Sequence, residues 1–353
     1  MAKSLISGVR VTGIAGAVPE AKVDNLTGQT FCSEEDRRKI IALTGVPGYR
    51  KAKDGQCASD LCVAAAGSLL DQLKVDAADI DAIVFVSMTP DYRVPSTACV
   101  LQDRLGCART TIAYDINMGC SGYVVGLFNA CTLISGGGLN RVLLLAGDTQ
   151  TKLCYPRDKN VAFILADGGS ATIVERGTDD DVITIELMTD GSRFENLYVP
   201  AGGCRRPSDD NSRQVRERSD GGLRADDNLY MNGMEIFKFS STDVVKSLAN
   251  FMEQGQISPD DFSHLVLHQA NKFMNDKVAR KLKFPADKVP YSIGVYGNTG
   301  SASIPLTIAH HFAGGKGERP GRSLLCGFGV GLSWGIVDIS LDGLCTPSIV
   351  ECA

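Results

Sequence analysis

Short apolar runs alternate with longer segments of helical spacing, and this alternation limits the possible folds more than any other feature. The runs at 80–88, 141–146 and 170–175 are short and rich in apolar or β-branched residues, whereas 58–73 and 95–105 show helical patterns. A strand that is apolar on both sides must be covered on both sides, and helices between strands supply that cover. The sequence therefore predicts an α/β protein with a mostly parallel sheet and helices on both faces.

Further elements continue this alternation along the chain. A helix is predicted at 33–43, where Ser33 can cap the first turn and three acidic residues follow it. The glycines at 136–138 predict the end of a helix that covers 124–134. The other expected elements are strands at 9–18 and 182–188, helices at 234–252, 271–282 and 300–312, and an antiparallel pair within 323–341.

Length and composition exclude several classes of protein. The 353 residues are too many for one small core, so one large domain or two similar halves are expected. The net charge of −5 argues against a nucleic-acid binder. No apolar run approaches the ~18–20 residues of a membrane span, and the N-terminus lacks the apolar core of a signal peptide. A cytoplasmic location is predicted.

Twelve cysteines suggest disulfides or a metal site, but the sequence fits neither. Thiols stay reduced in the cytoplasm. No Cys-x-x-Cys pair occurs, and His264, His268, His310 and His311 show no zinc-ligand spacing relative to the cysteines. Most of the cysteines are expected to be small core residues, and no bound metal is predicted.

Cys120 differs from the other cysteines because it stands between a β-prone run (110–116) and a helical pattern (124–134), flanked by Gly119 and Ser121. At such a corner, unpaired N–H groups and the helix dipole favour a thiolate. The dipole contributes only about 0.3–1 kcal/mol, so a nucleophile there needs a further partner, usually a histidine. The alternative at this point is a buried structural thiol.

Two more corners of this kind occur later in the chain. His268 ends an apolar strand and precedes a helix, and Asn298 lies in a glycine-bounded turn that also precedes a helix. Alone, a single histidine is more often a hydrogen-bonded core group, and a Gly-Asn turn is often only turn chemistry. Each motif taken singly is weak.

The segment 204–227 interrupts the α/β pattern. It holds six arginines, six acidic residues and few apolar residues. One interpretation is a basic flap that grips an acidic partner. The other, which the balance of charge favours, is a solvated surface loop.

Together the three corners resemble the β-ketoacyl-acyl-carrier-protein synthase III family. Cys120 lies in Asp-Ile-Asn-Met-Gly-Cys-Ser-Gly, His268 in His-Gln-Ala-Asn, and Asn298 in Gly-Asn-Thr-Gly-Ser-Ala-Ser-Ile-Pro. Their order and spacing match the family's Cys–His–Asn triad. The stretches 231–238 and 327–335 are also similar to family segments. The resemblance covers nearly the whole chain, and 204–227 is its least similar part.

The resemblance implies a fold and an assembly. The implied fold is thiolase-like, with two pseudo-repeated α/β halves in a five-layer α-β-α-β-α arrangement. The implied assembly is a homodimer. Residues 1–180 would form the half that carries the nucleophilic cysteine. Residues 181–353 would form the half that carries the histidine and the asparagine.

The resemblance also implies a decarboxylative Claisen condensation without a cofactor. Cys120 would take an acyl group from an acyl-CoA or an acyl carrier protein (ACP). His268 and Asn298 would donate hydrogen bonds to the thioester carbonyl of malonyl-ACP or malonyl-CoA as it becomes an enolate. The enolate would attack the acyl-enzyme and give a 3-oxoacyl thioester. The backbone N–H groups of Cys120 and Val330 would form a second oxyanion hole, although the family usually has glycine at position 330.

Several positions depart from the family pattern. Lys39 and Leu43 replace a tryptophan and an arginine that grip CoA, which favours a carrier-protein donor over acetyl-CoA. Val94 replaces a bulky residue that caps the partner's acyl pocket, which predicts a primer longer than acetyl. Phe273 replaces an arginine, but a basic face remains and is predicted to dock an acidic carrier protein; the alternative is an ordinary solvated helix. The residues of this face are Lys238, Lys272, Lys277, Arg280 and Lys281.

The leading prediction is a condensing enzyme of specialised lipid, polysaccharide or secondary metabolism, and other functions remain as alternatives. The nearest alternative is an acyltransferase of the same fold that moves an acyl chain to an alcohol or amine without forming a carbon–carbon bond. A catalytically silent partner protein is disfavoured because Cys120, His268 and Asn298 are all present. A nucleotide-binding oxidoreductase is disfavoured because no Gly-x-Gly-x-x-Gly follows the first strand.

Overall fold

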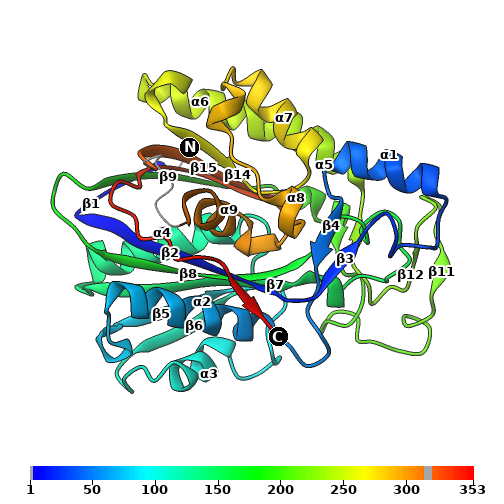
Figure 1. The fold of residues 1–353 in the computed structure, drawn as a ribbon, viewed down its shortest axis with the longest axis horizontal. Coiled ribbons are helices and arrows are strands. Elements are labelled where there is room, and N and C mark those ends of the chain that lie inside the picture. The colour runs from blue at the N-terminus through cyan, green and yellow to red at the C-terminus, as the bar shows by residue number, and fades with distance from the viewer. Residues whose placement is uncertain (1–2, 314–319) are drawn as a thin grey trace.

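Two stacked sheets form the frame of the protein, and the computed structural model describes residues 3–313 and 320–353 (Figure 1). The first sheet consists of β17 (Val350–Cys352), β2 (Val9–Pro19), β8 (Asp167–Arg176), β7 (Arg141–Thr149), β5 (Ala82–Val86) and β6 (Ile112–Ile116), in that spatial order. The second consists of β1 (Lys3–Ser7), β9 (Val182–Thr189), β16 (Ser333–Ser340), β15 (Arg322–Gly329) and β14 (His264–Leu267). Each sheet thus takes one edge strand, β17 or β1, from the opposite end of the chain.

Both sheets are mixed: the prediction of a mostly parallel sheet holds for the first sheet and is wrong for the second. In the first sheet β8 runs antiparallel to both of its neighbours, β2 and β7, while the other pairings are parallel. In the second sheet β14 and β15 are parallel and the remaining pairings are antiparallel. The apolar runs could not show this, because a strand buried on both faces has the same composition whichever way it runs.

The helices complete five layers, which confirms the predicted arrangement (Figure 1). The outer face of the first sheet is covered by α2 (Ala58–Leu73) and α3 (Thr97–Arg104). The central layer consists of α4 (Gly122–Gly137) and α9 (Ser303–Phe312), each of which contacts both sheets. The opposite outer layer consists of α5 (Gly233–Phe239), α6 (Val245–Gly255) and α7 (Lys272–Lys281). Toward one end of the molecule lie α1 (Glu34–Thr44) and the pair β3 (Lys22–Asp24) with β4 (Gly48–Arg50), and α8 (Ile293–Tyr296) contacts β4. A further short pair consists of β10 (Leu197–Tyr198) and β13 (Tyr230–Met231).

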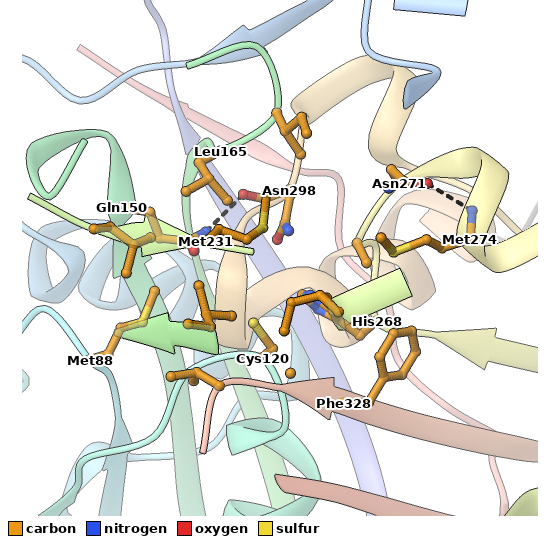
Figure 2. A pocket seen from close by; sticks show the side chains of 17 residues that line it. Met88, Cys120, Gln150, Leu165, Met231, His268, Asn271, Met274, Asn298 and Phe328 are labelled. Atoms are coloured by element: carbon orange, nitrogen blue, oxygen red, sulfur yellow. Dashed lines mark hydrogen bonds between the residues drawn. The ribbon is translucent and has the colours of Figure 1, made fainter. Parts of the chain in front are cut away.

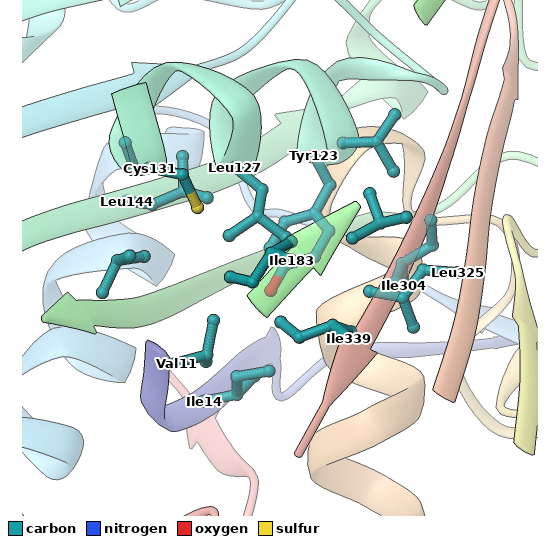
Figure 3. Close-up of a cluster of buried hydrophobic side chains, with 14 of the residues drawn as sticks. Val11, Ile14, Tyr123, Leu127, Cys131, Leu144, Ile183, Ile304, Leu325 and Ile339 are labelled. Atoms are coloured by element: carbon teal, nitrogen blue, oxygen red, sulfur yellow. The ribbon is translucent and has the colours of Figure 1, made fainter. Parts of the chain in front are cut away.

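The main core lies where the central helices meet the two sheets (Figure 3). Tyr123, Leu127 and Cys131 repeat every four residues along α4 and are fully buried. In this cluster they pack with Leu144 of the first sheet and Ile183 of the second. Because both of its sides are buried, α4 has little freedom to move relative to either sheet.

Several predicted helix boundaries are confirmed, and two differ. Ser33 caps α1 by accepting the Asp36 N–H at 3.1 Å, and Gly138, with φ 73°, is the C-cap of α4. The helix predicted from Pro95 begins later, at Thr97, with Ser96 as its N-cap. The long helix predicted at 234–252 is interrupted by a π-helical turn (Ser240–Val244) between α5 and α6. Such a turn adds a residue without reversing the chain, so the hydrophobic pattern alone does not reveal it.

The segment 204–227 lies at the end of the molecule near β3 and contains the short pair β11 (Arg216–Glu217) and β12 (Leu223–Arg224) (Figure 1). Arg206 and Arg218 both bind the Asp226 carboxylate, at 2.7 and 2.5 Å. Arg224 is buried and pairs with Asp158 and Asp220. These arginines are engaged within the chain, which leaves the segment with less charge to grip a partner.

Candidate active site

The three corners singled out in the sequence lie at one pocket (Figure 2). Cys120 stands just before α4, His268 just after β14, and Asn298 just before the turn that leads into α9. The rest of the wall is mainly apolar and comes from both halves of the chain. Its members include Met88, Leu165, Leu197, Leu229, Met231, Ile236, Met274 and Phe328.

The glycine loop at the end of β15 presses against Cys120. A Cβ on Gly329 would lie 2.5 Å from the Cys120 Cβ and 2.7 Å from its Sγ, and Gly329 has φ 155°. Only glycine combines this backbone conformation with so close an approach. The thiol is therefore held between the start of α4 and the end of β15.

Burial keeps Cys120 protonated in the resting protein. Removal from water raises the pKa of this thiol to about 11, and the buried Asp148 carboxylate raises it further. The backbone N–H groups of Val330 and of Cys120 itself act in the opposite direction, because they donate to the sulfur. The two N–H groups expected to form an oxyanion hole thus both point at the thiol.

Val330 occupies the glycine loop without strain. Its neighbours Gly329 and Gly331 have positive φ, while Val330 does not. The Val330 side chain packs on Gly119, where a Cβ would meet it at 2.9 Å and the Met88 sulfur at 2.8 Å. A valine is therefore tolerated at this position because the two glycines beside it adopt the unusual conformations.

His268 is held as a neutral ring. Burial lowers its pKa to about 3, although the Gly300 carbonyl favours the charged form. Its Nδ1 lies 2.6 Å from Ser303 Oγ, which also accepts the Gln269 N–H at 3.3 Å. The Ser303 hydroxyl proton can therefore be donated to Nδ1, which favours the tautomer with its proton on Nε2. The Phe328 ring packs edge-on against the imidazole, with 5.6 Å between centroids.

Asn298 is anchored by its backbone and by its side-chain oxygen. Its carbonyl accepts from Gln150 Nε2 and from the Ala166 N–H, both at 2.8 Å, and its own N–H donates to the Ile164 carbonyl. Its Oδ1 accepts the Gly300 N–H at 3.0 Å. The amide NH₂ is the part of the side chain left to donate a hydrogen bond in the pocket.

Sequence reasoning missed the residues that support Cys120, His268 and Asn298. Ser303 lies inside the motif that identified Asn298, and its part became visible only once α9 was placed beside His268. Gln150 follows the apolar strand β7, and a buried polar residue directly after such a strand is a usable signal. Met88 gave no signal, because a methionine after an apolar strand looks like core.

Other predicted positions lie outside the pocket. Val94 is 83% exposed and is not part of the pocket wall. Lys39 and Leu43 lie on α1, where Lys39 pairs with Glu35 at 2.6 Å. The five cations of the predicted docking face lie on α5 and α7.

Within 3–313 and 320–353, no three His, Cys, Asp or Glu side chains gather as a metal site. All twelve cysteines are free thiols. Over the same ranges, no helix has the length and apolar character needed to span a bilayer.

The fold and its relatives define an acyltransferase of the thiolase-like class. The solved 3-oxoacyl-(acyl-carrier protein) synthase from Burkholderia xenovorans LB400 superposes with a TM-score of 0.92 over 99% of both chains, at 36% identity. The family model for 3-oxoacyl-[acyl-carrier-protein (ACP)] synthase III matches residues 114–191, and the model for its C-terminal part matches 252–340. This chain belongs to the 3-oxoacyl-ACP synthase III family of condensing enzymes.

Two further relatives show how far the likeness extends. A putative 3-oxoacyl-[acyl-carrier-protein] synthase 3 of Campylobacter jejuni is 32% identical over 99% of this chain and 98% of its own length. The priming β-ketosynthase of the R1128 polyketide pathway is 26% identical, with a TM-score of 0.83 over 97% of this chain and 98% of its own.

Alkylation of Cys120 by iodoacetamide should rise about tenfold per pH unit through the neutral range and beyond, because only the thiolate reacts and the pKa is about 11. His268 should add no inflection near neutrality, since its pKa is about 3. Peptide mass spectrometry separates Cys120 from the exposed Cys99 and Cys204. A rate that levels off near pH 7 would show instead that a thiolate–imidazolium pair exists.

Proposed function

We propose that the protein loads an acyl group on Cys120 and condenses it with a malonyl thioester to give a 3-oxoacyl thioester. The observation that carries this proposal is the meeting of Cys120, His268 and Asn298 at one pocket, with two backbone N–H groups directed at the sulfur. No group in this triad carries a charge at rest. We infer that hydrogen-bond donors, rather than ion pairs, stabilise the charge that develops.

In the first step the Cys120 sulfur attacks the carbonyl of the donor thioester. The N–H groups of Cys120 and Val330 can stabilise the thiolate as it forms and then the oxyanion of the tetrahedral intermediate. The departing thiolate of CoA or the carrier protein takes up the proton that Cys120 loses. One thioester is thereby exchanged for another, and no cofactor is needed.

In the second step His268 Nε2–H and the Asn298 NH₂ donate to the carbonyl of the malonyl thioester. Carbon dioxide leaves, and its electron pair becomes the enolate that these two donors stabilise. The enolate carbon attacks the acyl-cysteine carbonyl, and Cys120 departs as a thiolate and is reprotonated. Loss of one such donor typically costs about 2.7–4 kcal/mol of barrier.

The apolar wall of the pocket suits an acyl chain and the uncharged arm of a carrier or CoA thioester. Where α1 contacts α7, the apolar side chains of Leu43 and Phe273 are 55% and 44% exposed. Neither can bind a nucleotide phosphate. These side chains support a carrier-protein donor. We propose a reaction in lipid biosynthesis or in a specialised lipid, polysaccharide or secondary-metabolite pathway of the cytoplasm, which the likeness to a 3-oxoacyl-[acyl-carrier-protein] synthase and to a priming ketosynthase supports.

Replacement of single triad members should separate the two steps. Cys120→Ala should abolish the acyl adduct detected by intact-protein mass spectrometry after incubation with acyl-CoA or acyl-ACP. His268→Ala should still form the adduct, because the thiol and its N–H donors remain, but should release carbon dioxide from malonyl-ACP about 100–1,000-fold more slowly.

An adduct unchanged in Cys120→Ala would contradict the covalent step. Full condensation by His268→Ala would contradict the role given to the histidine. A wild-type enzyme that forms the adduct but never decarboxylates malonyl-ACP would favour the alternative, transfer of the acyl group to an alcohol or amine.

The proposed homodimer rests on an open sheet edge. Strand β6 lies at the edge of the first sheet and pairs only with β5 among the described strands. Three apolar side chains near this edge are exposed: Ile112 on β6, and Tyr92 and Val94 on the loop before α3. Pairing of two β6 edges would cover them and bring Val94 of one copy toward the acyl site of the other.

Val94→Phe should shorten the preferred acyl chain, because a larger side chain fills the space that valine leaves. The ratio of rates for long over short acyl donors should fall about tenfold or more. Competition among acyl-ACPs of graded length measures this ratio, and Val182→Phe, at a half-exposed valine of β9, is the control. Unchanged selectivity would remove Val94 from the acyl site.

The proposed carrier-protein surface combines charge with exposed apolar side chains. Phe237 of α5 stacks on Phe273 of α7 with 5.5 Å between centroids, which places the two helices side by side. Lys238 and Arg280 are exposed beside this pair, and Lys277 is partly exposed. Of the remaining predicted cations, Lys272 pairs with Asp276 and Lys281 binds the Ser241 carbonyl. An acidic helix with an apolar ridge fits such a surface.

Lys277→Glu should raise KM for carrier-protein thioesters roughly 2–10-fold and weaken the dependence of KM on salt, because an attractive rim charge becomes repulsive. Turnover of a short N-acetylcysteamine thioester, which cannot reach the surface, should not change. Lys74→Glu, in the opposite outer layer after α2, is the matched control. Equal effects of the two variants would argue against docking on α7.

A further inference from the structure

We propose that Asp148 is a positioning residue for the decarboxylation step: its carboxylate joins the corner that carries Asn298 to the side of the site that carries Cys120. The inference rests on the proposed function for its kinetic consequences. The hydrogen bonds and packing contacts from which it is argued are those of the folded chain. Asp148 does not itself line the pocket, so it acts through the groups that it holds.

Asp148 is a fully buried carboxylate at the end of β7. Its Oδ1 accepts the Met88 N–H at 2.8 Å and the Ser87 hydroxyl at 3.2 Å. Its Oδ2 accepts the Ser301 N–H at 2.8 Å. One carboxylate thus satisfies donors from two segments that are more than 200 residues apart in the chain.

On one side this carboxylate supports the corner of Asn298. A Cβ on Gly300 would lie 2.4 Å from Asp148 Oδ2, so Gly300 packs directly on the carboxylate. Asn298 Oδ1 in turn accepts the Gly300 N–H, and Gln150, two residues after Asp148, binds the Asn298 carbonyl. The Gly300 carbonyl also interacts with the His268 ring. A shift of Gly300 would therefore move both proposed enolate donors.

On the other side the same carboxylate supports the segment beside the nucleophile. The Met88 N–H is bound by Asp148, and the Met88 sulfur packs where a Cβ on Gly119 would stand, one residue before Cys120. Ser301 makes a second link across this boundary, since its hydroxyl donates to the Val86 carbonyl at 3.4 Å. The carboxylate thus sets the spacing between the acyl-carrying thiol and the enolate donors.

No ion pair found within residues 3–313 and 320–353 includes Asp148. Burial raises its pKa to about 6, against the opposing effect of the hydrogen bonds from Ser301, Met88 and Ser87. The titratable groups that respond to it are two buried thiols, Cys120 before α4 and Cys62 of α2, whose pKa values it raises. Both carboxylate oxygens of Asp148 accept hydrogen bonds. An asparagine in this place would present its NH₂ group to one of the donors and leave that donor without an acceptor.

Asp148→Asn preserves the shape and removes one acceptor and the charge. We expect carbon dioxide release from malonyl-ACP to fall about 100-fold in kcat, because a small displacement of the two donors is enough. KM for malonyl-ACP and the extent of Cys120 acylation should change less than about threefold. The pH profile of Cys120 alkylation should move to lower pH, since a nearby negative charge that disfavours the thiolate is gone.

Asp167→Asn is the matched control. Asp167 is also a fully buried carboxylate, but its hydrogen-bond donors are the Ala52 N–H and the Thr151 N–H and hydroxyl, which belong to neither the Gly300 corner nor the Met88 segment. The Asp167→Asn variant should keep the ratio of decarboxylation to acylation within about threefold of wild type, and the pH profile of Cys120 alkylation should not move. The selective loss expected of Asp148→Asn is therefore not a general effect of losing a buried charge.

A full decarboxylation rate in Asp148→Asn, or equal loss of acylation and decarboxylation in both variants, would overturn the proposal. If Asp148→Asn fails to fold by circular dichroism, Ser87→Ala removes one hydrogen bond to Asp148, together with the local bonds of Ser87 to Thr89, without changing the charge. It should lower decarboxylation about 2–5-fold, and an undiminished rate would then overturn the proposal. Failure of the proposed function would appear separately, as a wild-type enzyme that does not decarboxylate, while the alkylation profiles would still test the placement of Asp148.

Discussion

The burial of α4 and α9 between the two sheets sets the geometry of the pocket. Both helices begin at the pocket, so the packing that fixes their axes also fixes the residues at their N-terminal ends. Ser121, beside Cys120, is tied across the layers to Ser333 of the second sheet by a 2.6 Å hydrogen bond. Ser303, in the first turn of α9, reaches His268 after β14. The geometry of the site is thus a consequence of how the layers stack.

The same burial decides the electrostatics of the site. It moves the pKa of the thiol up to about 11 and that of the imidazole down to about 3, so neither Cys120 nor His268 is charged at rest. What the pocket offers to a developing negative charge is a set of preoriented donors: backbone N–H groups at the sulfur, an imidazole N–H and an amide. Such donors need no reorganisation when charge appears, which suits thioester chemistry in a dry, apolar cavity.

Parts of the fold could be predicted from sequence and others could not, for identifiable reasons. Helix ends followed from local chemistry, as at Ser33 and at Gly138, because caps involve residues a few positions apart. The direction of β8 did not follow, because hydrogen-bond partners in a sheet are distant in sequence. In the site, Cys120, His268 and Asn298 were found through their motifs. The supports of these residues, Ser303, Gln150 and Asp148, were not found, since their partners lie on other elements.

Composition, spacing and short motifs were enough to predict the class of fold, the family and the three side chains that stand at strand or helix ends. Three features came from the folded chain alone: the three side chains meet at one pocket, burial holds the thiol and the imidazole neutral, and the Asp148 carboxylate joins the two sides of the site. The physical reason is that desolvation and hydrogen bonds between distant segments exist only once the five layers have closed around the pocket.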